Sequence, residues 1–98
     1  MVTLPSFATV QDVIDNHLDQ QFDSHEFIDT FIRVHEREYV EGLSSAIDEE
    51  GGIFRAYHAQ IGLLLSRRQH ELGIRSLGRV TSENIKGYDS ENELWVKA

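Results

Sequence analysis

Apolar side chains recur along the first three quarters of the chain at the spacing that buries one face of an α-helix. The first stripe predicts a helix over residues 10–19, with Thr9 as its N-cap and Pro5 just upstream. An amphipathic helix of this length needs a partner to cover its apolar face, so it is expected to join a core. The stripe consists of Val10, Val13, Ile14 and Leu18.

The clearest helix start lies at Asp23. Glu26 follows three residues later, so the pair forms a capping box in which each side chain bonds the backbone amide of the other residue. Aromatic and apolar residues spaced by four follow, and they predict a helix over residues 24–49. Because a row spaced by four drifts around a helix of 3.6 residues per turn, this helix either bends around the core or breaks near Gly42.

Two glycines separate this segment from the next helix. Gly51 and Gly52 supply a left-handed C-cap and a tight turn, and the next pattern predicts a helix over residues 54–72 that Gly73 ends. Leu63 projects from the side of that helix opposite its core face. Either a second element covers Leu63, or it is exposed at a contact surface. The predicted core face consists of Phe54, Ile61, Leu65 and Leu72, flanked by Tyr57, His58, Leu64 and Arg68.

After Gly73 the pattern changes to β-branched and aromatic residues among turn formers. Strands over residues 74–85 and 93–97, joined by a loop over residues 86–92, are the simplest account. Trp95 is expected to be at least partly buried, because an isolated hairpin is marginally stable in water. The sequence therefore predicts one α+β domain over residues 1–98, with three or four helices and a C-terminal two-stranded hairpin.

The order helix, glycine turn, helix, hairpin over roughly residues 24–98 resembles the winged helix-turn-helix family. The resemblance implies that the second helix of the pair enters the major groove of DNA and that the hairpin, the wing, touches the DNA backbone. The hairpin departs from this pattern, since Glu83, Asp89, Glu91 and Glu93 accompany its lysine. The side chains that the resemblance assigns to nucleic acid are Arg55, Gln60 and Arg67 on the helix, and Arg75, Arg79 and Lys86 in or beside the wing.

Charge divides the 98-residue chain into two unlike halves. The whole sequence holds 9 basic and 17 acidic residues, a formal net charge of −8. Residues 1–52 carry a net −10 and residues 53–98 a net +2. Such asymmetry is typical either of a basic binding face on an acidic support or of ordinary solvated helix surfaces.

Several chemistries find no support. The absence of cysteine excludes disulfides, thiolate metal sites and thiol nucleophiles. The pairs His25 with Asp29 and His35 with Glu38 have helical ligand spacing but do not match a zinc signature, so no metal or cofactor is expected. Nucleophile-elbow, phosphate-loop and dinucleotide motifs are missing, and the chain is therefore predicted not to be an enzyme.

Two function classes remain. The first is a nucleic-acid-binding or transcription-regulatory domain that contacts duplex DNA. The second is a protein interaction or assembly module, a homodimer among its forms, in which Leu63 lies at the contact. The apolar run at residues 61–65 is far shorter than the roughly 20 residues that cross a bilayer, and we expect no membrane or small-molecule partner and a cytoplasmic location.

Overall fold

The structure is a computed structural model that describes residues 1–98, and it confirms the predicted α+β class. The chain has five helices and three strands: β1 lies between α1 and α2, and β2 and β3 follow the last helix. One hydrophobic core is packed between them. Their bounds are α1 Phe7–His17, β1 Gln21–Asp23, α2 Ser24–Val34, α3 Glu36–Ser45, α4 Ile53–Arg67, α5 Gln69–Leu72, β2 Ile74–Glu83 and β3 Asp89–Lys97.

The sheet is antiparallel and has the strand order β1-β3-β2. The predicted hairpin is present as β2 and β3, although its second strand begins at Asp89 rather than Glu93. The third strand, β1, was not predicted. Its three residues are too few for a periodic signal. Phe22 is placed by its pairing with Trp95 of β3.

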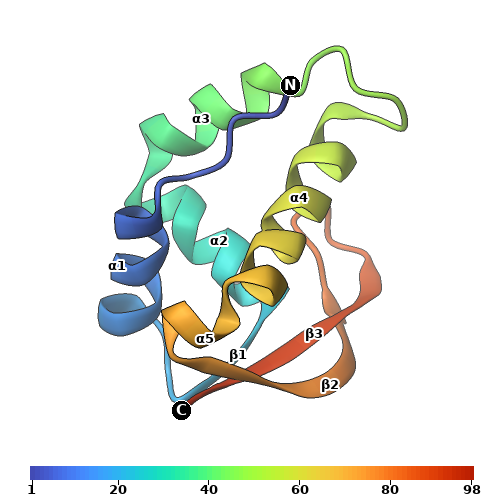
Figure 1. Cartoon of the computed structure of the whole chain (residues 1–98). Coiled ribbons are helices and arrows are strands. Elements are labelled where there is room, and N and C mark those ends of the chain that lie inside the picture. The colour runs from blue at the N-terminus through green and yellow to red at the C-terminus, as the bar shows by residue number, and fades with distance from the viewer.

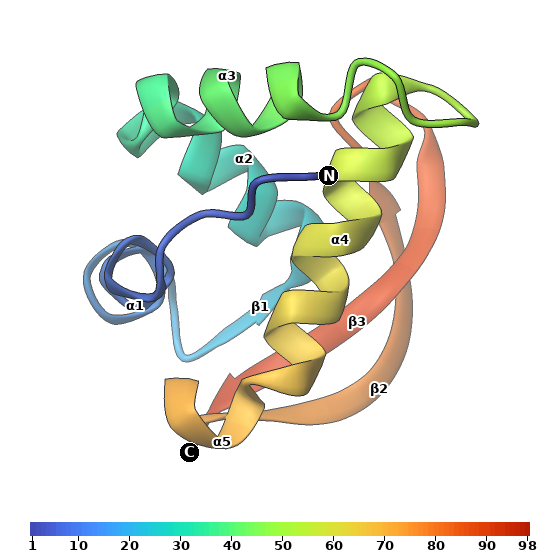
Figure 2. The same ribbon diagram turned by 45° about the horizontal axis from the view of Figure 1, so that its top comes forward.

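The helices form a layer on one face of the sheet (Figure 1). The two long strands bend strongly, so the hairpin curves around α4, as the turned view shows (Figure 2). A register shift at Ser76 and Gly78 marks a bulge in β2, and bulges of this kind increase the bend and twist of a strand.

The first helix begins earlier than predicted. Ser6, not Thr9, is the N-cap of α1, and its Oγ accepts a hydrogen bond from the Thr9 backbone N–H at 3.2 Å. The Thr9 hydroxyl instead donates to Glu38 Oε1 at 2.5 Å. A contact with a residue 29 positions away is invisible to a local capping rule, which explains the error.

The predicted 24–49 helix breaks, but at His35 rather than near Gly42. His35 has φ −124° and ψ 54°, which ends α2 and starts α3 in a new direction. Gly42 lies inside α3 and serves close packing. A Cβ at this position would lie 2.0 Å from the Tyr57 hydroxyl oxygen, so only glycine lets α4 approach.

The remaining helix ends agree with the predicted ends only in part. Helix α3 stops with Ala46 as its C-cap, and Gly51 and Gly52, both with positive φ, form the turn before α4. The predicted 54–72 helix is interrupted at Arg68, whose guanidinium makes two hydrogen bonds to Glu71 at 2.8 and 2.9 Å. The left-handed C-cap at Gly73 is confirmed, with φ 70°.

The core draws on every long element. Trp95 is 1% exposed and its indole N–H donates to Ser24 Oγ at 3.0 Å, which confirms the predicted burial of the hairpin against the helices. Tyr57, Ile61 and Leu65 make up the buried face of α4. None of the helices is both long and apolar enough to cross a membrane.

Candidate functional site

The largest concavity runs between α4 and the hairpin and has a volume of about 950 Å³. We call it the α4–hairpin groove. Helix α4 forms one wall, the β2–β3 turn and the strands beside it form the other, and the start of α2 closes the inner end. Because the hairpin curves around α4, the two walls face each other along much of the helix (Figure 2).

The α4 wall presents residues that recur at helical spacing. Arg55, Ala59 and Leu63 follow one another by four positions, so they share one side of the helix, and all three are exposed. Phe54 stands beside them and is 36% exposed. Its predicted place on the core face is therefore wrong, and Tyr57, predicted only to flank that face, is the fully buried residue.

The hairpin wall is held by its own turn chemistry. The Asn84 side-chain Oδ1 accepts hydrogen bonds from the backbone N–H groups of Lys86 at 3.0 Å and Tyr88 at 3.2 Å, which fixes the turn. Ile85 and Lys86 then lie in the groove wall. The Lys86 ammonium lies 5.6 Å from the centre of the Phe54 ring, so the hairpin turn closes onto the first turn of α4.

A polar network at the inner end joins α2 to both hairpin strands. The His25 ring forms hydrogen bonds through Nδ1 to Ser82 Oγ at 2.9 Å and through Nε2 to Ser90 Oγ at 3.3 Å. The Asn92 side chain accepts from the His25 backbone N–H at 3.0 Å. Both ring nitrogens of His25 therefore face serine hydroxyls, unlike the base of a Ser-His-Asp triad, which a carboxylate orients. The network positions the hairpin on α2.

His58 lines the same groove and is neutral at physiological pH. Its Nε2 lies 2.8 Å from the Tyr39 hydroxyl, and its ring packs edge-on against Phe54 with centroids 5.9 Å apart. Burial lowers the pKa of His58 to about 4, and the charges of His25 and Lys86 act in the same direction. Its predicted position beside the Phe54 side of α4 is confirmed.

The structure brings together half of the predicted nucleic-acid contacts. Arg55, Arg79 and Lys86 all line the α4–hairpin groove. Gln60, Arg67 and Arg75 are not among its lining residues. The predicted interface residue Leu63 is exposed to 43% and lies in this same groove, so residues predicted for both function classes share one surface.

Acidic residues share the groove with these cations. Glu91 and Glu93 lie along β3, and Glu93 Oε1 is 3.6 Å from the Arg79 guanidinium. The Ser76 hydroxyl also donates to Glu93. Arg79 is thus partly neutralised, whereas Arg55 has no ion-pair partner and Lys86 only a ring face.

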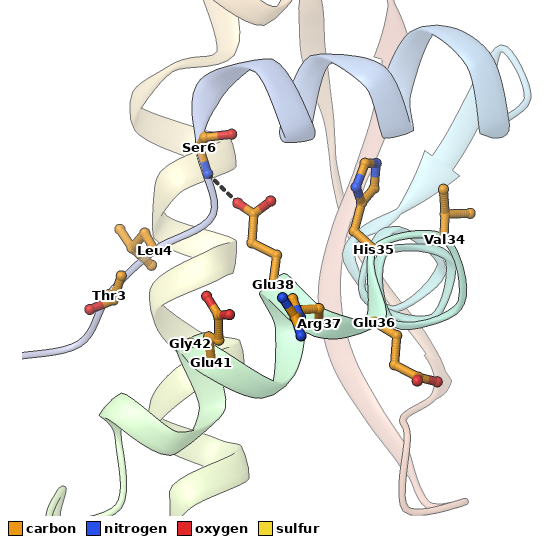
Figure 3. A pocket seen from close by; sticks show the side chains of 10 residues that line it. All are labelled: Thr3, Leu4, Ser6, Val34, His35, Glu36, Arg37, Glu38, Glu41 and Gly42. Carbon is orange, nitrogen blue, oxygen red and sulfur yellow. Dashed lines mark hydrogen bonds between the residues drawn. The ribbon is translucent and has the colours of Figure 1, made fainter.

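A second, polar cleft of about 670 Å³ separates the N-terminal segment from α3 (Figure 3). Glu38 points into it and accepts a hydrogen bond from the Ser6 backbone N–H at 2.6 Å, while Glu36 points away. The Thr3 backbone N–H donates to Ser45 Oγ at 2.7 Å. These contacts bind the N-terminal segment to α3, so this cleft has a structural role.

The histidine and carboxylate pairs with metal-like spacing do not converge. No group of three or more such side chains is arranged to hold a metal ion. His35 Nε2 instead lies 2.8 Å from Asp12 Oδ2, and the ring is half-buried between α1 and the α2–α3 break. Hydrogen bonds from Asn16 and then His35 lower the pKa of the Asp12 carboxyl.

Sequence reasoning missed the polar part of the groove. His25, Asn84 and Asn92 were not predicted as site residues, yet they fix the hairpin that forms one wall. The Asn84 turn carries a local signal, because asparagine commonly bonds the backbone two residues on. The link between His25 and Asn92 spans 67 positions and leaves no local trace.

Comparisons with protein-family models, with curated proteins and with solved structures found no significant match to this chain.

Proposed function

We propose that this chain is a non-enzymatic, winged-helix-like domain that binds nucleic acid through the α4–hairpin groove. The observation that carries the proposal is that Arg55 of α4 meets Arg79 and Lys86 of the hairpin along one groove, in a domain with a net charge of −8. Guanidinium and ammonium groups of this kind are the usual partners of phosphate oxygens.

The arrangement of elements supports the winged-helix part of the proposal. Helix α4 follows a tight turn and lies beside a hairpin, as the second helix and the wing do in that family. The short strand β1 comes between α1 and α2 and pairs with β3, so the hairpin is tied to the helical layer. A fold of this kind hosts many functions, and the groove chemistry therefore has to select among them.

The net charge of −8 limits the form that binding can take. A polyanion is repelled by the domain at long range, but charges separated by more than about 10 Å are largely screened at 0.1 M salt. Binding must then come from the few cations of the groove, with little electrostatic steering. The proposal predicts weak affinity and a shallow salt dependence, corresponding to about two neutralised phosphates.

Titration of labelled nucleic acid, single- and double-stranded, at low and moderate salt tests this function. Arg55→Ala and Lys86→Ala should each weaken binding about fivefold or more and flatten the salt dependence. Arg67→Ala, outside the groove but on the same helix, is the matched control and should bind as wild type does. Equal losses for all three variants, or no binding at low salt, would remove the proposal.

A second candidate is a protein contact at the same groove. The favouring observation is the exposed apolar surface of Leu63, Phe54 and Ile85, at 43%, 36% and 44%. Partly exposed apolar and aromatic side chains that lie in one groove are frequent in the cores of protein interfaces. Solution mass across a concentration series, for wild type and Leu63→Glu, tests self-association; a larger wild-type mass that the substitution abolishes would favour this candidate over nucleic acid.

A further inference from the structure

We infer that the α4–hairpin groove takes a single strand of nucleic acid rather than a duplex. The inference rests on the proposed function and names its ligand class. It follows from three features: the position of the hairpin turn, the apolar side chains in the groove walls, and an exposed aromatic ring in the same turn.

The hairpin turn covers the part of α4 that would have to enter a major groove. Recognition helices contact base edges with their N-terminal residues. Here Lys86, at the hairpin turn, lies 5.6 Å from the ring of Phe54 in the first turn of α4, and both residues line the groove. A helix with its side chains is about 10 to 12 Å across and a major groove about 12 Å wide, so the first turn of α4 could enter that groove only if the hairpin turn moved off it. In this the hairpin differs from a wing that touches the DNA backbone beside an inserted helix.

The groove combines apolar side chains with cations, and a single strand has both base faces and phosphates to bind. Leu63, Phe54 and Ile85 present partly exposed apolar surface within the groove, which suits the faces of unpaired bases. Arg55 and Lys86 supply charge for the backbone phosphates. In a duplex the base faces are stacked on one another, and only phosphates and base edges would meet these walls.

An exposed aromatic residue follows Lys86 in the β2–β3 turn. Tyr88 is 71% exposed in the β2–β3 turn, two residues after Lys86, and its backbone N–H is fixed by Asn84. A solvent-facing ring on a turn whose backbone is fixed offers a face on which a base can stack, and stacking tolerates any base sequence. Glu91 and Glu93 on β3 oppose phosphate on their side, which favours a path along α4 and the turn.

The test is a fluorescence-anisotropy titration of a labelled, unstructured DNA strand of about 12 nucleotides and of the duplex made from it. The strand should bind at least about tenfold more tightly than the duplex. Its affinity should fall with salt with a logarithmic slope of about −1.4, as about two phosphate contacts require.

Variants separate stacking from charge. Tyr88→Ala should weaken strand binding about fivefold or more. Tyr88→Phe keeps the ring and should bind the strand as tightly as wild type does. Tyr88 is highly exposed, so both proteins should fold, and thermal melts verify this. Arg37→Ala on α3 lies outside the groove and should change neither ligand's affinity.

Each other outcome overturns a defined part of the account. Duplex binding as tight as strand binding, or unaffected strand binding in Tyr88→Ala, refutes the single-strand inference and leaves the proposed function standing. Binding of neither nucleic acid at low salt refutes both. Binding of a labelled polyglutamate peptide, with no nucleic-acid binding, assigns the groove to an acidic protein segment and also refutes both.

Discussion

Tyr57 carries the one buried side-chain polar atom without a hydrogen-bond partner, its hydroxyl oxygen. The ring is fully buried against Gly42, and burial raises the pKa of the hydroxyl, so the group is neutral. An unpaired buried hydroxyl costs about 1 to 3 kcal/mol, because it has lost its hydrogen bonds to water. The ring itself fills the core and anchors α4.

Tyr57→Phe is therefore expected to raise the free energy of unfolding by about 1 kcal/mol. The substitution removes the orphaned oxygen and leaves the packed ring in place. Urea denaturation of the two proteins measures the difference, and Tyr39→Phe is the control because the Tyr39 hydroxyl is bonded to His58. A less stable Tyr57→Phe protein would show that the hydroxyl is satisfied in solution.

His58 predicts how stability depends on pH. Its pKa is lowered to about 4 in the fold and is about 6.5 in the unfolded chain, so the unfolded state binds the proton first as pH falls. Stability should be complete above pH 6.5 and decline toward pH 4, by about 1 to 2 kcal/mol after allowance for partial exposure.

Replacing His58 with glutamine should flatten this decline, because the amide does not titrate in that range. Unfolding free energies at a series of pH values between 7 and 4 check the prediction. The exposed His70 provides the matched control, and His70→Gln should leave the profile unchanged. A profile that keeps its slope in His58→Gln would assign the pH dependence to another group.

At the scale of elements, helix boundaries follow from local sequence where the partner is close in the chain. The capping box at α2 is confirmed in both of its bonds: Asp23 Oδ1 accepts from the Glu26 N–H at 2.8 Å, and Glu26 Oε1 accepts from the Asp23 N–H at 3.2 Å. The cap also ends β1, so one residue fixes the junction between strand and helix.

Asp23→Ala should consequently lower the free energy of unfolding by about 0.5 to 2 kcal/mol, through an unsatisfied amide in the first turn of α2. Urea melts of the variant and wild type measure it. Asp19→Ala, an exposed aspartate just upstream, controls for the loss of one negative charge. Equal midpoints for Asp23→Ala and wild type would contradict the cap.

Other boundaries depend on contacts that sequence spacing cannot reveal. The drift of the apolar row indicated a bend or break in the 24–49 segment. The helix breaks at His35, whose ring contacts Asp12 on α1, and spacing alone could not locate that contact. Gly42 was offered as the place of a break, and instead it lies within α3 and makes room for Tyr57. Strand β1, only three residues long, forms because its backbone pairs with β3.

At the scale of the whole molecule, the curvature of the hairpin decides which surfaces meet. The sequence pattern assigned the basic residues of the second half and Leu63 to two different function classes. The bent strands place Leu63 in one groove with Arg55 and Lys86, because the hairpin curves around α4. Strand bending and long-range links such as His25 to Asn92 have no periodic signature, so this convergence was not predictable.

The most direct test of the α4–hairpin groove as the binding surface is an NMR titration that follows every backbone amide as the unlabelled single strand is added. Amide shifts should move for residues of α4 from Arg55 to Ser66 and for the hairpin from Arg79 to Glu93, because these segments line the groove. The amides of α1 and α3 should stay unmoved. Shifts confined to α1 and α3, or spread evenly over the domain, would contradict the account.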